Sequence, residues 1–318
     1  MIKLVKNRKE KGKELSKFFC QTVADLMDHD DKLVFLDADL ASPSGSTIIE
    51  KSHPDKFINV GIAEANMVGI AAGLSIEGFK PFIHSFAPFA SRRVFDQIYL
   101  SGAYAKSTIN IYGSDPGFTV GPNGGTHTSF EDVALYRTIP DAVIVDVADT
   151  TQLESAIRQA ASEPGIKYIR LNRKAVRNVY EPGSEFTFGK GVVVKEGKDV
   201  LVITAGQILS DALDAAEELE AKGVSVEVVD IYTTKPLDVE LILSRVKGKK
   251  ALVTFENHSI IGGLGSAVAE VLAEHNVNIV FKRHGVTDRF GQVGTPDFLQ
   301  AEYNLTGKDL VKTIEALL

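Results

Sequence analysis

The stretch GIAEANMVGIAAGLSIEGFKPFIHSF, residues 61–86, sets the architecture of this chain. Residues 63–77 have the apolar spacing of a helix, and residues 81–86 then form a short apolar run typical of a buried strand. A helix that leads directly into a buried strand is the building unit of a parallel sheet covered by helices. The stretch therefore predicts an α/β fold.

The same alternation continues on both sides of this stretch. A further helix is expected after residue 86 through Tyr104, and another at residues 150–162 with threonine caps. Buried strands are predicted at residues 32–39, 108–114, 142–149 and 166–172. Strands and helices in this order predict a mostly parallel sheet with helices on both faces.

The pattern breaks at NVYEPGSEFTFGKG, which starts at Asn178 and has Pro, Gly and Ser without a helical period. A second alternating set follows, with strands predicted at residues 200–206, 224–231, 251–257 and 278–286. We therefore expect two three-layer α/β/α domains with mostly parallel sheets. The first spans residues 1–178, a linker spans 179–190, and the second spans 191–318.

Composition excludes several classes of protein. The 318 residues carry a formal net charge of −7 without clustered basic residues, which argues against nucleic-acid binding. No apolar segment is long enough to suggest a membrane span. The single cysteine, Cys20, excludes an internal disulfide framework and fits a cytoplasmic location. No Cys/His cluster has metal-ligand spacing, so no metal site is predicted in this chain.

Candidate site residues follow the predicted strands, because ligands of such sheets bind at the carboxyl ends of strands. Glu64 opens a helix, and spacing alone indicates only a first-turn acid that complements the helix dipole. Phe86 and Phe89 follow a strand and are either core residues or a stacking surface for a planar heterocycle.

The stretch GFTVGPNGGTHTSFEDVALYR, from Gly117, is shaped for close approach to a small ligand. It delivers His127 just before a helix, and its flanking glycines leave little core to bury that ring. A site role is therefore favoured for His127. Asp115, Asn123 and Arg170 occupy similar positions after strands, although Asp115 and Asn123 suit turns equally well.

Small residues gather on one face of the helix predicted at residues 63–77: Ala65, Gly69, Ala72 and Gly73. Such a face allows another backbone to approach closely. The approaching backbone belongs either to the chain's own sheet or to a second subunit, and spacing alone favours neither.

Several segments, in order, resemble transketolase and the related 1-deoxyxylulose-5-phosphate synthase. They are GIAEANMVGIAAGLSIEGFKPF, SFAPFASRRVFDQI, VGPNGGTHTSFEDVALYRTIPDAVIVDVADTTQL, ENHSIIGGLGSAVAEVL and GVTDRFGQVGTPDFLQAEYNLT. The resemblance covers nearly the whole chain and corresponds to the pyrimidine-binding and C-terminal domains of transketolase. The domain with the diphosphate and metal site, including a GDG…N motif, has no counterpart in this sequence. The chain thus resembles the C-terminal subunit of a split transketolase.

The resemblance implies a role for each cofactor residue. Glu64 matches the catalytic acid that hydrogen-bonds N1′ of the aminopyrimidine of thiamine diphosphate. Phe89 matches the aromatic residue that stacks on this ring, with Phe86 behind it. Arg92 matches an arginine near the cofactor, and Asp39 matches a residue that contacts the cofactor across the dimer.

The resemblance also implies substrate residues. His127 matches a catalytic histidine that hydrogen-bonds the substrate, and Arg170 and Arg8 match arginines that hold its phosphate. Two positions depart from the family pattern: Asn123 stands where transketolases have Asp, and Asp115 stands where they have His. Because a carboxylate repels a phosphate dianion, a different sugar phosphate or a sulfonate sugar is expected as substrate.

The implied activity is transfer of a two-carbon ketol unit from a ketose donor to an aldose acceptor. The implied cofactors are thiamine diphosphate and Mg²⁺, with the metal ligands expected from an N-terminal partner subunit. The implied assembly is a homodimer core within a heterotetramer. Two alternatives stay open: a synthase-like or 2-oxoacid-dehydrogenase β-type subunit, and a non-catalytic subunit that kept the fold.

Overall fold

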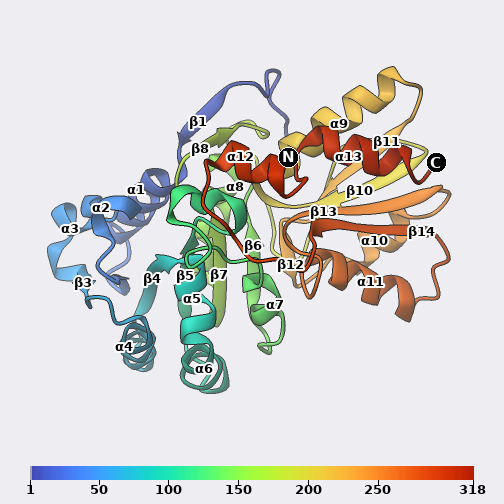
Figure 1. Cartoon of the computed structure of the whole chain (residues 1–318). Coiled ribbons are helices and arrows are strands. Elements are labelled where there is room, and N and C mark those ends of the chain that lie inside the picture. The colour runs from blue at the N-terminus through green and yellow to red at the C-terminus, as the bar shows by residue number, and fades with distance from the viewer. Residues whose placement is uncertain (1) are drawn as a thin grey trace.

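The computed structural model describes residues 2–318 and contains two mostly parallel sheets, one in each half of the molecule (Figure 1). In spatial order, the first sheet comprises β12 (Thr233–Lys235), β6 (Val143–Asp146), β7 (Ile166–Leu171), β5 (Ile109–Ser114), β4 (Lys80–Phe86), β2 (Leu33–Asp37) and β3 (Phe57–Asn59). The second comprises β14 (Val280–Val286), β13 (Ala251–Ser259), β10 (Val200–Thr204), β11 (Val226–Asp230) and β9 (Val192–Lys195). The predicted α/β fold class is confirmed.

Helices cover both faces of the first sheet. Its helices are α1 (Leu15–Met27), α2 (Ala41–Ser44), α3 (Thr47–Ser52), α4 (Glu64–Ile76), α5 (Ala87–Ala90), α6 (Phe95–Gln97), α7 (Asp132–Arg137) and α8 (Thr150–Ser162). In β4, Phe82 belongs to the apolar cluster that contains α1 and α8, whereas Ile83 belongs to the cluster that contains α4. Alternate side chains of a strand point to opposite faces, so a strand covered on both sides is apolar throughout.

The second sheet is covered in the same way. Its helices are α9 (Leu209–Ala221), α10 (Val239–Arg245), α11 (Leu264–Glu274) and α13 (Gly307–Glu315), whereas α12 (Pro296–Glu302) packs against the segment Gly117–Asn123 of the first domain. The apolar cluster beneath α9 and α13 is continuous with the cluster beneath α1 and α8. This shared core fixes the two domains against each other. Among residues 2–318, every helix is too short or too polar to cross a bilayer.

Two details of the predicted helices are wrong. The helix expected after residue 86 is broken into α5, a 3₁₀ turn at Arg92–Val94, α6 and a π-helical turn at Ile98–Tyr104. At the first break, Ser91 leaves the helical conformation and its hydroxyl donates to the Ala87 carbonyl oxygen over 2.6 Å. The helix at residues 150–162 is present, but its cap is Asp149, whose carboxylate accepts from the backbone N–H groups of Thr151 and Gln152.

The predicted linker, residues 179–190, has no helix or strand, yet its start is packed between the domains. Tyr180 is buried, and its hydroxyl donates to Asp230 over 2.6 Å. The chain also crosses back, because β12 pairs antiparallel with β6 of the first sheet. Near the N-terminus, β1 (Lys11–Glu14) pairs with β8 (Ala175–Arg177). The boundaries at 178 and 191 stay predictions, and β12 shows that residues beyond 191 also build the first sheet.

Candidate active site

Glu64 is a buried acid at the N-terminus of α4, against the end of β4. Its side chain is 3% exposed. Ser85 Oγ donates to its Oε1 over 3.2 Å, and Arg93 Nη1 donates to the same oxygen over 2.8 Å. The partial positive charge of a helix N-terminus favours a carboxylate here. Its cationic partner, Arg93, is 43% exposed. A ligand from solvent can therefore reach Glu64 by displacing Arg93.

Three aromatic rings meet beyond the end of β4. The centroid of His127 lies 5.1 Å from that of Phe89 and 5.7 Å from that of Phe86, both edge-on. Phe86 is buried, whereas Phe89 and His127 are partly exposed. The structure thus brings together the predicted stacking pair and the predicted substrate histidine, although the histidine lies on a different loop.

The neighbouring arginines Arg92 and Arg93 have different partners. Arg92 donates to Glu131 over 2.7 Å and to the Thr126 carbonyl oxygen over 3.2 Å, so it braces the loop that carries His127. Burial raises the pKa of Glu131, and the Arg92 guanidinium opposes this shift. The cofactor role predicted for Arg92 stays a prediction.

Arg93 lies among the candidate site residues, although the sequence prediction did not name it. Its Cζ lies 3.7 Å from the centroid of the Phe89 ring, and its Nη1 donates to Glu64. It therefore touches both residues expected to hold the aminopyrimidine. Because Arg92 and Arg93 share one 3₁₀ turn, sequence spacing does not distinguish their directions.

The loop Gly117–Asn123 presses against the second domain. A Cβ atom on Gly117, which has a φ of +62°, would lie 2.0 Å from Asn257 Oδ1, so only glycine fits. Asn257 accepts from the Phe118 N–H over 3.1 Å and donates to the Pro116 carbonyl oxygen over 3.1 Å. The second domain therefore fixes the position of this loop.

Asp115 follows β5 with a φ of +53° and is 2% exposed. Its partner is Arg173, whose backbone N–H donates to Oδ1 over 2.8 Å and whose Nε donates to Oδ2 over 2.5 Å. Burial raises the pKa of Asp115, and the Arg173 guanidinium opposes this shift. Arg173 also lies over the Phe86 ring at 4.8 Å from its centroid. Arg173 is thus a second residue that the sequence prediction missed.

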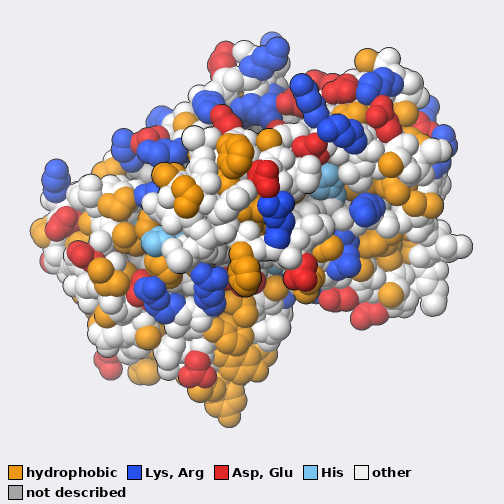
Figure 2. All heavy atoms as spheres, in the orientation of Figure 1, with side chains coloured by type: hydrophobic (Ala, Val, Ile, Leu, Met, Phe, Trp, Pro, Cys, Tyr) orange, Lys and Arg blue, Asp and Glu red, His pale blue; other side chains and the backbone are white. Residues whose placement is uncertain are grey.

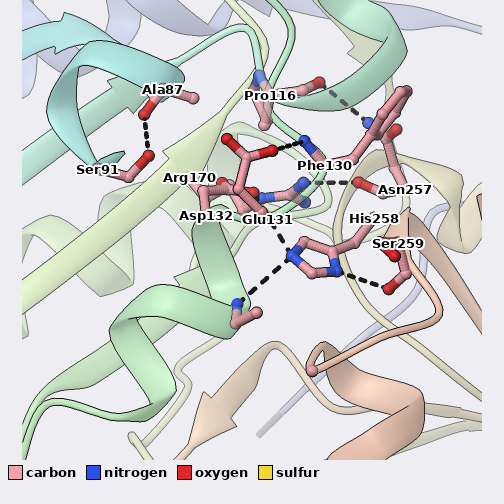
Figure 3. Close-up of polar contacts among 12 residues, drawn as sticks. Ala87, Ser91, Pro116, Phe130, Glu131, Asp132, Arg170, Asn257, His258 and Ser259 are labelled. Atoms are coloured by element: carbon pink, nitrogen blue, oxygen red, sulfur yellow. Dashed lines mark hydrogen bonds and ion pairs between the residues drawn. The ribbon is translucent and has the colours of Figure 1, made fainter. Parts of the chain in front are cut away.

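Arg170, predicted to hold the substrate's phosphate, is sealed between the domains (Figure 3). Its Nε donates to Asp132 over 2.7 Å, its Nη1 to Asp146 over 2.5 Å and its Nη2 to the Asn257 carbonyl oxygen over 2.6 Å. Every guanidinium nitrogen is engaged and the side chain is 1% exposed, so no face is left for a phosphate. Arg170 lies within β7 on the face of Tyr168, beneath α7, whereas Arg173 lies beyond the strand's end.

Arg8, the other arginine predicted to hold phosphate, also lies elsewhere. Its Nη2 donates to Glu217 over 2.6 Å and to Asp214 over 3.4 Å. Both acids belong to α9 of the second domain, so Arg8 joins the N-terminal segment to that helix and does not reach the three rings.

Asp39 and Asn123 lie at the edges of the site. Asp39 follows β2 with a φ of +62°, is exposed and accepts from Asn59 over 3.3 Å. Asn123 ends the 3₁₀ segment that begins at Gly117, and it is also exposed. Both side chains are accessible to a ligand or a partner, and their cofactor and substrate roles stay predictions.

His258 is buried at the domain junction (Figure 3). Burial lowers its pKa to about 4, so the ring is neutral near pH 7. Glu256 accepts from the backbone N–H groups of Leu264 and Gly265 at the start of α11, and burial raises its pKa to about 7. Within residues 2–318, no group of three or more His, Cys, Asp or Glu side chains is arranged to hold a metal ion.

Comparison with known families agrees with this geometry. Residues 11–179 match the model of the transketolase pyrimidine-binding domain, and residues 189–310 match that of the transketolase C-terminal domain. This chain belongs to the transketolase family. The match covers the domain that carries Glu64, the three rings and Arg93, and also the domain that holds the glycine-rich loop in place.

Individual transketolase relatives are similar over most of this chain. The 6-deoxy-6-sulfo-D-fructose transketolase subunit of Clostridium sp. (strain MSTE9) is 46% identical, over 89% of this chain and 88% of its own length. The putative transketolase C-terminal section of Methanocaldococcus jannaschii is 39% identical, with 95% of each chain covered. A solved structure described as "Split gene transketolase, inactive beta4 tetramer" has a TM-score of 0.89 and 39% identity, over 96% of this chain and 99% of that one.

The predicted function is confirmed by these relatives. The chain is the C-terminal subunit of a thiamine-diphosphate-dependent transketolase, a family of transferases. Its two α/β domains are the pyrimidine-binding and C-terminal domains of that family.

Proposed function

We propose that this subunit supplies the pyrimidine-binding half of the cofactor site and transfers ketol units only with an N-terminal partner subunit. That partner is assigned the diphosphate and Mg²⁺ sites. The observation that carries the proposal is the pairing of the buried acid Glu64 with the partly exposed ring of Phe89. An aminopyrimidine needs both an acid for its ring nitrogen and a flat apolar surface.

Glu64 is assigned the proton that is shared with N1′ of the aminopyrimidine. Thiamine diphosphate, when bound, supplies the carbanion chemistry that breaks and forms the carbon–carbon bond. Phe89 stacks on the pyrimidine ring, and Phe86 supports Phe89 from within the core. Ser85, which donates to Oε1 of Glu64, fixes the direction of the carboxyl group.

His127, Asn123 and the Asp115–Arg173 pair are assigned to the substrate. His127 is partly exposed beside Phe89, so it suits a hydrogen bond to the donor's carbonyl or hydroxyl oxygen. Arg173 takes the anionic end of the sugar, in place of Arg170. Its guanidinium already pairs with Asp115, which weakens its attraction for a doubly charged group.

The donor assigned to this pocket is a ketose with a sulfonate end. A sulfonate carries one negative charge, whereas a phosphate monoester carries about 1.5–2 at pH 7. Asp115 therefore repels a phosphate more strongly than a sulfonate. The relative from Clostridium sp. is named for a sulfonated ketose, 6-deoxy-6-sulfo-D-fructose, which supports this choice.

The homodimer is assigned to an exposed face on α4 and the π-helical turn. On α4, Ala65, Gly69 and Gly73 are exposed, and a Cβ atom on either glycine would meet no atom within 4 Å. Large apolar side chains flank them: Ile62, Ile76, Leu100 and Tyr104 are between 50% and 82% exposed. Figure 2 shows hydrophobic side chains gathered at the lower end of the molecule, where Figure 1 places α6. A contiguous apolar surface of this kind marks an interface.

Mixing experiments test the partnership. The purified chain alone is expected to be a dimer or larger assembly without ketol-transfer activity. Adding the N-terminal subunit, thiamine diphosphate and Mg²⁺ is expected to restore activity in a complex with two copies of each subunit. Transfer by this chain alone would show that the partnership is not required.

A donor panel tests the substrate. We expect the assembled enzyme to use 6-deoxy-6-sulfo-D-fructose with a higher kcat/KM than xylulose 5-phosphate. Full activity on xylulose 5-phosphate with none on the sulfonate would remove the sulfonate assignment but leave the cofactor assignment intact.

A further inference from the structure

Arg93 makes two contacts that belong, under the proposed function, to the cofactor. Its Nη1 donates to Oε1 of Glu64 over 2.8 Å, and its Cζ lies 3.7 Å above the Phe89 ring. A guanidinium group is planar, bears N–H donors at its edge and stacks on aromatic faces. An aminopyrimidine ring is also planar and also meets Glu64 with a ring nitrogen and Phe89 with its face.

We propose that Arg93 is a placeholder for the aminopyrimidine, and that it must leave Glu64 and Phe89 when thiamine diphosphate binds. This inference rests on the proposed function, because it assigns Glu64 and Phe89 to the cofactor. Two planar groups cannot occupy the same place between one carboxylate and one ring. Arg93 therefore competes with the cofactor instead of holding it.

The burial of the two partners explains why a placeholder is useful. Glu64 is 3% exposed, and a carboxylate that is buried without a partner is unfavourable. Before the cofactor binds, Arg93 supplies that partner and covers the apolar face of Phe89. The contact therefore gives Glu64 a cationic partner and Phe89 a covered face in the absence of cofactor.

The exposure of Arg93 explains why it can leave. Its side chain is 43% exposed, so the guanidinium is readily hydrated when it rotates away from Glu64, and the free-energy cost is small. Arg92 is equally exposed but has different partners, Glu131 and the Thr126 carbonyl oxygen. The adjacent arginines thus have different functions. Arg92 stabilises the loop that carries His127, and Arg93 occupies the position of the aminopyrimidine.

The inference predicts that removing the placeholder tightens cofactor binding. When the competent state is only partly populated, the apparent dissociation constant rises by the inverse of that population. An exposed ion pair and a cation–π contact are each weak. Together they predict that Arg93→Met lowers the Kd for thiamine diphosphate by about three- to tenfold.

The test measures the Kd of thiamine diphosphate, at fixed Mg²⁺, in the complex assembled with the N-terminal subunit. Wild type, Arg93→Met and Arg93→Lys are compared, and Arg158→Met is the matched control. Arg158 also donates to a glutamate, Glu154, over 2.8 Å, but it lies on α8 away from the site. We expect tighter binding for Arg93→Met, an intermediate value for Arg93→Lys and no change for Arg158→Met.

A structure of the wild-type complex with cofactor gives an independent readout, with Arg93 expected beyond hydrogen-bond distance of Glu64. Unchanged or weaker binding by Arg93→Met, or Arg93 still on Phe89 with the cofactor bound, would overturn the inference alone. A wild-type complex that binds no thiamine diphosphate would overturn the proposed function, and this inference with it. A size-exclusion profile equal to wild type shows that each variant assembles.

Discussion

Two arginines of this subunit pair with acids in opposite surroundings. Arg93 meets Glu64 at the rim of the candidate site, where the arginine is 43% exposed. Arg170 meets Asp132 and Asp146 between the domains, where it is 1% exposed. At the rim, water is available to solvate the arginine when its contact is lost. At the junction it is not, so each lost contact leaves a buried charge.

The difference separates replaceable contacts from structural ones. An ion pair open to solvent contributes about 0–1 kcal/mol to stability, so a ligand can exchange with it. A sealed pair is strongly destabilising when one partner is removed, because the remaining charge has no solvent. We infer that the rim serves binding and that the Arg170 cluster fixes the domain arrangement that positions the glycine-rich loop.

Substitution of Glu64 is expected to give the largest effect and tests the rim side of the comparison. Glu64→Ala should lower ketol transfer by the assembled enzyme about 10²–10⁴-fold, because a positioned acid–base group is lost. The midpoint of urea unfolding should stay close to that of wild type. Proton exchange at C2 of the bound cofactor, followed by NMR, is the direct measurement. If the mutant complex exchanged this proton at the wild-type rate, Glu64 would be only an acid at the start of α4 without a catalytic role.

Substitution of Arg170 tests the junction side. Arg170→Met should destabilise the subunit by about 3–5 kcal/mol, since Asp132 and Asp146 stay buried without their cation. Urea unfolding followed by circular dichroism measures the change. Arg93→Met is the rim counterpart and is expected to destabilise less, because it leaves one buried acid, Glu64, without its cation instead of two. Equal effects of the two variants would erase the distinction between rim and junction.

The pH dependence of stability sharpens the comparison at another buried acid of the junction, Asp230. Burial raises its pKa from 3.8 to about 7, so its contribution is complete below pH 4 and is lost as the pH rises to 7. We expect a loss on the order of 3 kcal/mol from this group over that range.

The variant Asp230→Asn isolates this contribution. Its amide oxygen can accept from Tyr180 and Gln152, as Oδ2 of the aspartate does, but the side chain has no charge to bury. Unfolding free energies measured between pH 4 and 8 should therefore fall less steeply in the variant. Parallel curves for wild type and variant would show that Asp230 does not titrate in this range.

Substitution of His127 tests whether this rim residue binds the substrate and not the cofactor. His127→Ala should lower turnover about 10–100-fold, since one hydrogen bond to a group that is charged, or becomes charged during the reaction, is worth about 1.5–3 kcal/mol. The Kd of thiamine diphosphate should change much less, because Glu64 and Phe89 are intact. Weakened cofactor binding with normal turnover would assign His127 to the cofactor.

The smallest expected effect concerns donor choice. Asn123→Asp combined with Asp115→His should shift the ratio of kcat/KM values towards xylulose 5-phosphate by about tenfold. Histidine tolerates the positive φ of position 115, and it removes the carboxylate beside Arg173. The ratio is measured with the sulfonated and phosphorylated donors. An unchanged ratio would show that both positions tolerate substitution without a role in specificity.

The sequence predicted elements well where local rules suffice. The helix Thr150–Ser162 has its predicted bounds, and each predicted strand of the first sheet lies within a residue or a few of its expected place. Period and turn residues are local properties. The predicted helix through Tyr104 failed because Ser91 turns the chain between α5 and the next turn, a choice that packing makes.

Candidate site residues were predicted by type and motif, and the misses share one cause. Glu64, Phe86, Phe89 and His127 lie together around the end of β4, although their chemical roles stay predictions. Arg170 was predicted and Arg173 was not considered, although both arginines are close to the end of β7. Only the directions of their side chains distinguish the two arginines. Those directions depend on which face of the first sheet packs against the second domain.

The sequence by itself determined the alternating elements, the two α/β domains and the transketolase resemblance, and through that resemblance it named the acid, rings and histidine as candidate site residues. These properties follow from residue order, because periodicity and motif spacing lie within single segments. Tertiary structure alone decided that β12 joins the first sheet, that Arg170 is sealed by Asp132 and Asp146, and that Arg93 covers Glu64. Each of these contacts joins segments far apart in the chain, so burial and charge pairing determined them only after the domains packed together.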